Sequence, residues 1–389
     1  MLDKSISLLL TLSLLIWLSP FISRVIRVPT PPVEILLGSL FAYIGFIEHH
    51  EYFDLVAEVG FLYLMFLAGM EVDLKQILTS SPRLIQQSII FLILMVLLSI
   101  FFGWFFNLSI IVIISLPLIS IGLLASLSKI YGKDREWLKL AFIVGVLGEM
   151  VSIAALTTLE AASMVGFGLE LFIKMVYLIA FLYATIALYR LLNLMFWWYP
   201  ELKRTIIPKF DTADQDIRLA IALFFVMIVV MLQLGLELAL GAFIAGVAIS
   251  AFFHHEKGLE EKVSSFGFGI LVPIFFIHVG SSFDLGSLGV EGVMSGATLI
   301  TALMIIIRLL SAYSLKHIYG SKSALLTAFS LSMPLTLLVA VATIGYNAKL
   351  IDLLSYYQLI LASLLQIIIS MIAIKLLSKN GLDRIEVVK

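Results

Sequence analysis

Residues 138–159 read LKLAFIVGVLGEMVSIAALTTL, and Glu149 is the only side chain that ionises between Lys139 and Glu160. The length of this apolar stretch matches the about 20 residues that a transmembrane helix needs. A carboxylate at the centre of such a helix costs roughly 2.5–3.5 kcal/mol on insertion scales, so by default it marks an ion or proton pathway. The stretch therefore predicts a membrane helix that carries a functional acid.

Composition places the whole chain in the same class. Of its 389 residues, 61% are hydrophobic and 13% are charged, whereas soluble domains are about 45–50% apolar and about 25% charged. The net charge is −1 and the basic residues are scattered, so neither nucleic acid nor an acidic partner is indicated. The absence of cysteine excludes disulfides, thiolate metal sites and a cysteine nucleophile. The sequence predicts an integral membrane protein in contact with lipid.

Apolar runs between charge or turn clusters give thirteen candidate spans. The second is short and the eighth and ninth are nearly continuous, so a count of twelve is the alternative. The first run extends to about Phe21 without a small-residue cleavage site, which favours a spanning helix over a signal peptide. The candidates are residues 5–22, 33–47, 53–70, 86–106, 109–128, 138–159, 170–194, 217–235, 238–253, 265–283, 294–315, 323–346 and 355–378.

The distribution of basic residues supports this count. Of the 25 Lys and Arg residues, 21 fall after odd-numbered spans or at the C-terminus, Arg308 falls inside a span, and three lie on the other side. Because cytoplasmic loops are enriched in Lys and Arg, we expect the N-terminus outside and the C-terminus in the cytoplasm. The longest loop, about Trp197–Asp216, could join two structural halves. We expect one transmembrane domain, residues 1–378, and a short cytoplasmic tail, residues 379–389.

The surroundings of Glu149 suggest an ion site. Gly145 and Gly148 leave space beside the carboxylate on one helix face, and Ser152 adds an oxygen within one turn. Hard cations such as Na⁺ prefer oxygen ligands. Burial also disfavours the charged form of a carboxyl, which lets protons compete with the cation. The alternative is a protonated glutamic acid that only hydrogen-bonds between helices.

Arg308 is the second charge that lies deep within a span. It keeps its charge and lies eight residues before Lys316, which is too deep for it to reach the interface easily. It therefore needs an anion, and we expect Glu149 to be its partner when the site is empty. A permanent structural ion pair is the alternative.

Two spans contain residues that interrupt helices. Pro117, Ser120 and Gly122 interrupt the fifth, and the twelfth is interrupted by Ser332, Met333, Pro334 and Thr336. Carbonyls and half-helix ends at such breaks bind ions in transporters, commonly where two inverted repeats meet.

The histidines suggest no metal centre. His278 could titrate near neutral pH, although its position near a helix end is more typical of an interfacial histidine. The pairs at residues 49–50 and 254–255 lack a third ligand. No cofactor, no metal beyond a transported cation and no enzyme site are expected.

Three segments together resemble the bacterial monovalent cation:proton antiporters of the Kef and NapA kind. They are FLYLMFLAGMEVDL at residues 61–74, LALGAFIAGVAIS at residues 238–250 and VPIFFIHVGSSFDL at residues 272–285. The resemblance implies an all-α membrane protein of about thirteen helices, an inverted-repeat fold with two broken crossing helices, and a homodimer with interleaved core and dimerisation subdomains. It also implies a bacterial inner membrane as the location.

The resemblance also implies roles for single residues. Glu149 falls where the family has its ion-binding aspartate, Gly148 replaces a preceding Asn, Gln or Asp, and Arg308 matches the core lysine or arginine. The stretch Ser120–Gly122 matches the unwound crossing, where Ile119 replaces a common threonine, and the Pro334 region lacks a Gly-Glu pair seen in many relatives. The short tail disfavours a ligand-gated potassium efflux system.

Two functions follow from these observations. The leading hypothesis is a secondary antiporter that exchanges H⁺ for Na⁺, or for K⁺ or Li⁺, by alternating access and without net charge movement. The rival is a transport-inactive homologue that acts as a membrane sensor or assembly subunit. The departures from the family pattern favour the rival. Retention of both costly buried charges, Glu149 and Arg308, favours transport.

Overall fold

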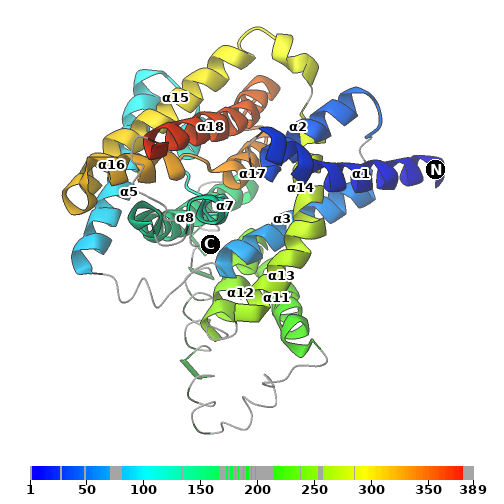
Figure 1. Ribbon diagram of the computed structural model, residues 1–389, viewed down its shortest axis with the longest axis horizontal. Coiled ribbons are helices and arrows are strands. Elements are labelled where there is room, and N and C mark those ends of the chain that lie inside the picture. Colours follow the sequence, from blue (N-terminus) through cyan, green and yellow to red (C-terminus); the bar gives the residue numbers. More distant parts are fainter. Residues whose placement is uncertain are drawn as a thin grey trace. The chain divides into compact units, whose positions relative to one another are not determined.

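The described residues of the computed structural model form helices joined by turns and irregular segments, without a strand among them (Figure 1). They are residues 2–26, 29–47, 50–70, 81–132, 135–165, 214–236, 238–252, 257–283 and 285–379, with scattered helical positions between 172 and 198. Eight of the described helices are long and apolar enough to cross a membrane. A ninth span results if the pair Gly320–Ser330 and Leu335–Asn347, bent by 42°, crosses as one.

The larger of two compact units contains Met1–Asp54, Gln76–Ser152 and Phe276–Lys389. Within it α15 packs along α18, with α5 and α16 beside them (Figure 1). Its helices are α1 (Leu2–Ile26), α2 (Thr30–Tyr43), α5 (Pro82–Phe105), α6 (Ile110–Ser115), α7 (Leu124–Tyr131), α8 (Glu136–Val165) as far as Ser152, the end of α14 (Val272–Ser281), η2 (Leu285–Gly289), α15 (Val293–Ser311), η3 (Ala312–Leu315), α16 (Lys316–Ser330), α17 (Leu335–Asn347) and α18 (Leu353–Lys379).

The second unit contains Leu55–Lys75 and Ile153–Phe275. Its described elements are most of α3 (Glu51–Met70), the end of α8, α11 (Gln215–Leu234), α12 (Leu238–Phe252), α13 (Lys257–Phe266), the π-helix η1 (Gly267–Leu271) and the start of α14. Helices α3 and α12 meet through glycines: a Cβ at Gly69 would lie 2.0 Å from the Phe243 carbonyl oxygen, and one at Gly246 would lie 2.0 Å from that of Phe66. Small residues allow such close backbone approach in membranes.

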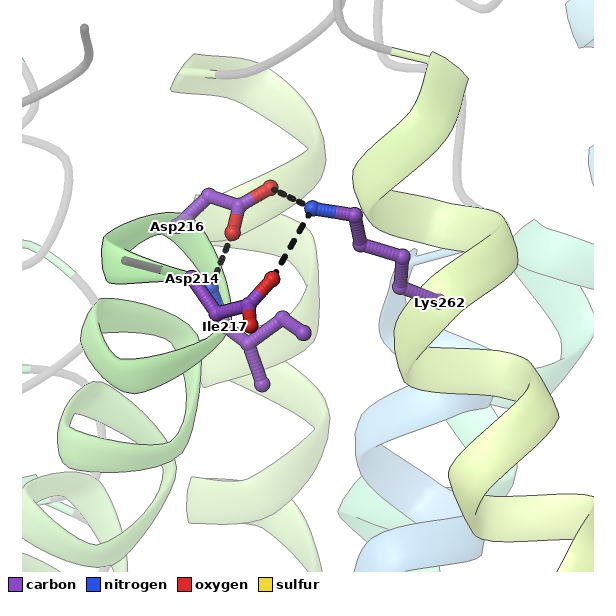
Figure 2. A network of polar contacts seen from close by, with 4 residues as sticks. All are labelled: Asp214, Asp216, Ile217 and Lys262. Atoms are coloured by element: carbon purple, nitrogen blue, oxygen red, sulfur yellow. Dashed lines mark hydrogen bonds and ion pairs between the residues drawn. The ribbon is translucent and has the colours of Figure 1, made fainter. Parts of the chain in front are cut away.

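Charged side chains connect the start of α11 with the middle of α13 in this unit. Lys262 Nζ lies 3.4 Å from Asp214 Oδ1 and 3.2 Å from Asp216 Oδ2 (Figure 2). Because these side chains are partly exposed, the pairs contribute little stability. They do place the first turn of α11 beside α13.

The expected spans agree closely with the helices. Each of them coincides with a described helix or with a pair of helices flanking a break, except 170–194, of which more than half lies outside the described residues. Most of the expected linker and residues 380–389 of the tail also lie outside them. The prediction of an all-α polytopic membrane protein with two broken helices is confirmed.

Candidate functional site

Both predicted helix breaks are present. α6 ends at Ser115 and α7 begins at Leu124, while α16 ends at Ser330 and α17 begins at Leu335. Each break contains a proline, Pro117 or Pro334, which cannot donate a backbone hydrogen bond to continue a helix. The Ser120 and Thr336 hydroxyl oxygens lie 3.2 Å apart, so the two breaks meet in the larger unit.

The Glu149 side chain points from α8 into this meeting point and is fully buried. Its Oε1 accepts a hydrogen bond from Ser120 Oγ at 3.3 Å, and its Oε2 accepts one from the Ile121 backbone N–H at 3.3 Å. The Gly122 N–H in turn donates to Ser120 Oγ at 3.4 Å. The carboxylate, two hydroxyls and the unwound backbone thus form a small polar cluster in an apolar interior.

Ser152, a predicted ion ligand, holds the first break rather than contacting the carboxylate. Its hydroxyl donates to the Gly148 carbonyl at 2.8 Å and accepts from the Ile119 N–H at 2.9 Å. Ser152 therefore satisfies a backbone donor that the unwound segment leaves without a helical partner.

Gly148 and Ile119 are complementary. A Cβ at Gly148 would lie 2.5 Å from Ile119 Cδ1 and 3.0 Å from its Cβ, so the isoleucine side chain fills the space beside the glycine. The space that the sequence suggested beside the carboxylate is thus occupied by the first break itself. The two departures from the family pattern, at positions 119 and 148, are in contact and compensate each other in volume.

This contact predicts how the two positions depend on each other. Replacing Gly148 with asparagine alone is expected to cost roughly 1–3 kcal/mol, as overpacking of a core does. Replacing Ile119 with threonine removes the nearest atom, Cδ1, so the double variant should regain part of the loss. Thermal unfolding of the three purified variants tests this. A double variant no more stable than Gly148→Asn would show that the volumes are not coupled.

Arg308 lies on α15 and is also fully buried. Its guanidinium donates to the Leu331 carbonyl at 3.0 Å, to the Leu116 carbonyl at 3.1 Å and to the Met304 carbonyl at 2.8 Å. A further hydrogen bond reaches the Leu118 carbonyl. Three of these acceptors lie where α6 and α16 end, so Arg308 satisfies carbonyls at both breaks.

The predicted ion pair between Arg308 and Glu149 is not formed in this structure. Arg308 bonds instead to backbone carbonyls at the C-terminal ends of α6 and α16, and these helix ends carry partial negative charge. Glu149 bonds to the Ile121 N–H ahead of α7 and to Ser120, whose hydroxyl oxygen lies 3.2 Å from that of Thr336 in the first turn of α17. Each of the two side chains thus has polar partners of its own at the breaks.

The remaining predicted residues surround this cluster. Ser332 is buried, and its hydroxyl donates to the Ala328 carbonyl at 2.7 Å. Its own carbonyl accepts from Ser370 Oγ at 3.4 Å. Pro334 directly precedes α17. The carbonyls of Leu116, Leu118 and Leu331 could not be identified from the sequence, because every residue has a backbone carbonyl whatever its type.

His278 belongs to a different part of the larger unit. Its Nε2 lies 2.8 Å from Asp54 Oδ1, and its ring lies against Phe53. Within the described residues, no group of three His, Asp or Glu side chains could hold a metal ion. His49, His254 and His255 lie outside those residues.

Comparisons with known proteins agree with this architecture. The family described as "Sodium/hydrogen exchanger, transmembrane" matches residues 9–379. The "Putative Na(+)/H(+) antiporter YjbQ" of Bacillus subtilis (strain 168) is 25% identical over 410 residues, covering 98% of this chain; the chain spans only 64% of that relative's length. The "Na(+)/H(+) antiporter" of Enterococcus hirae is 23% identical over 380 residues, covering 92% of this chain and 94% of the relative.

A solved structure has the same fold. The sodium proton antiporter MjNhaP1 from Methanocaldococcus jannaschii at pH 8 matches with a TM-score of 0.70 and 17% sequence identity, covering 97% of this chain and 98% of the other. At this identity the match establishes the architecture alone. The family match covers nearly the entire chain, and this chain belongs to the transmembrane sodium/hydrogen exchanger family.

Proposed function

We propose that this protein is a secondary active antiporter that exchanges protons for monovalent cations by alternating access, with Glu149 as the shared binding group. The observation that carries the proposal is the position of that carboxyl. It is fully buried where two helix breaks meet, and a hydroxyl and a backbone N–H hold its two oxygens. The family to which the chain belongs is one of transporters rather than of enzymes.

Glu149 suits this role because no basic side chain among the described residues pairs with it. A fixed ion pair would hold the carboxylate permanently charged and leave no reason for it to take up a proton. A carboxyl supported only by hydrogen-bond donors can instead be neutralised either by a proton or by a cation. The Ser120 and Thr336 hydroxyl oxygens, 3.2 Å apart, offer further ligands of the kind that hard cations prefer.

Na⁺ is the cation we propose first, with K⁺ and Li⁺ as the other candidates, because the names of both similar bacterial proteins specify Na⁺. The bacterial relatives suggest a bacterial inner membrane, and the distribution of basic residues supports the N-terminus outside and the C-terminus in the cytoplasm. From the family resemblance we propose a homodimer. The transmembrane domain would extend over residues 1–378.

The function can be tested in everted membrane vesicles from a bacterial host without its own sodium/proton antiporters. Respiration acidifies the vesicle interior, and added Na⁺, K⁺ or Li⁺ should release protons if the protein exchanges that cation. We expect the largest response to Na⁺. If none of the three cations releases protons while the protein is present in the membrane, the transport-inactive sensor or assembly subunit becomes the better description.

Exchange at a single carboxyl should move no net charge, because one proton replaces one monovalent cation. We therefore expect an imposed membrane potential to change neither the final cation gradient nor the final proton gradient in proteoliposomes. The measurement compares both gradients with and without a potential set by a permeant ion that the protein does not carry. A systematic shift in the final gradients would require a second titrating group in the transport cycle.

A further inference from the structure

The α1–α2 hairpin contains a second buried carboxyl. Glu34 on α2 is 3% exposed and Ser19 on α1 is fully buried, and Ser19 Oγ donates to Glu34 Oε1 at 3.1 Å. Val33 and Ile35, its neighbours along α2, are buried as well. The burial of Glu34 was not predictable from the sequence, because an acid near the start of a span resembles a solvated helix boundary.

No positive charge compensates Glu34 among the described residues. Of the elements packed against α2, α1 carries Arg24, whose guanidinium lies 6.0 Å from the Phe21 ring centroid, and α14 carries His278, which pairs with Asp54; η2 carries no titratable side chain. Pro31 and Pro32 remove two N–H donors from the start of α2. An ionised carboxylate here would be an unpaired charge among apolar side chains, which is strongly unfavourable.

Ser19 can serve both protonation states of this carboxyl. Its hydroxyl oxygen lies 3.1 Å from Glu34 Oε1 and also 3.3 Å from the Ile16 carbonyl oxygen. A hydroxyl donates one hydrogen bond and accepts two. A neutral Glu34 can therefore donate to Ser19 while Ser19 donates to Ile16, whereas an ionised Glu34 would require Ser19 to donate to the carboxylate instead.

The contact of α2 with α14 consists of close backbone approach and one hydroxyl. A Cβ at Gly38 would lie 2.2 Å from the Ile277 carbonyl oxygen, and one at Gly280 would lie 2.0 Å from that of Ile35, so the α2 and α14 backbones are in close contact. Ser39 Oγ also donates to the Gly280 carbonyl at 2.8 Å. A change of charge at Glu34 would act on its contact with α1, because the hydroxyl that bonds the carboxyl is that of Ser19.

We propose that Glu34 is a second proton-binding site, separate from Glu149, which holds its proton while α1 and α2 are packed together. Loss of that proton leaves an uncompensated charge in the hairpin and loosens α1 from α2. The site thus makes the packing of this hairpin sensitive to alkaline pH, whether or not the protein exchanges cations.

Difference infrared spectroscopy of the lipid-reconstituted protein tests the proton directly. The Glu149→Gln background removes the carboxyl of the transport site, so the result does not depend on the proposed exchange activity. We expect the carbonyl band of a protonated carboxylic acid at neutral pH, lost in Glu34→Gln and shifted in Ser19→Ala. Ser39→Ala, which removes a buried hydroxyl from the same helix, should leave the band in place. A band unaffected by Glu34→Gln would overturn the proposal.

Thermal unfolding provides a second readout. If the folded protein holds a proton that the unfolded chain has released, stability falls as the pH rises. Glutamine at position 34 keeps the size and the hydrogen bond but cannot ionise, so the unfolding temperature of Glu34→Gln should exceed that of the wild type increasingly toward alkaline pH. Identical pH dependence in both proteins would contradict a proton at Glu34.

Discussion

Replacing Glu149 with glutamine is expected to reduce cation-dependent proton flux to the rate of vesicles that lack the protein, while folding and membrane insertion are retained. The amide can reproduce both hydrogen bonds of the carboxylate. Its oxygen can accept from the Ile121 N–H and its NH₂ group can donate to Ser120 Oγ, the two contacts that Glu149 makes at 3.3 Å. What the amide cannot do is release a proton or neutralise a bound cation.

The measurement is the Na⁺-induced proton release in everted vesicles, normalised to the amount of protein in the membrane. Glu149→Asp is the matched control because it keeps the charge and shortens the side chain by one methylene. It should retain partial activity, since its carboxylate can move away from Ser120 and Ile121 but can still titrate. Full activity in Glu149→Gln would remove this carboxyl from the mechanism.

Residue type and order were sufficient to predict most of the architecture. A membrane helix must satisfy its own backbone, so long apolar runs specify spans, and the runs identified in the sequence coincide with the described helices. The breaks were also predictable, because Pro117 and Pro334 cannot continue a helix. The positions of Glu149 and Arg308 in spans followed from the cost of a buried charge.

The partners of the two charges were not predictable from the sequence. Pairing Arg308 with Glu149 assumed that a buried cation needs an ionised side chain. The carbonyls of Leu116, Leu118 and Leu331 take that place, and any residue other than leucine would offer the same oxygen. Glu34 shows the converse difficulty, because only the fold reveals that it is buried and that its polar contact is Ser19 of α1.

Removing Arg308 is expected to cause the largest loss of stability of any single substitution considered. Arg308→Gln leaves the buried carbonyls at both breaks short of donors, and each unsatisfied acceptor carries a desolvation penalty of about 1–3 kcal/mol. Relaxation of the breaks will recover part of this, so we expect a loss of roughly 3–5 kcal/mol, as for other buried charged groups that lose a partner. Unfolding of the purified protein in detergent measures it.

Arg308→Lys is the conservative control. An ammonium group keeps the positive charge near the ends of α6 and α16, but it lacks the planar set of five donors that allows Arg308 to reach both breaks at once. We therefore expect an intermediate stability and partial transport. Stability equal to that of the wild type would mean that the charge alone, and not the shape of the donor set, holds the breaks.

Combining Arg308→Gln with Glu149→Gln distinguishes hydrogen bonding of Arg308 to the carbonyls from an ion pair between Arg308 and Glu149. If the two side chains compensated each other as an ion pair, removing the carboxylate charge would relieve much of the penalty of losing the arginine. In the structure Arg308 bonds to carbonyls and Glu149 to a hydroxyl and an N–H, and glutamine preserves the contacts at position 149. The loss caused by Arg308→Gln should therefore be the same, within about 0.5 kcal/mol, in the wild type and in the Glu149→Gln variant. A clearly smaller loss in the Glu149→Gln variant would restore the direct ion pair to the mechanism, in a conformation other than this one.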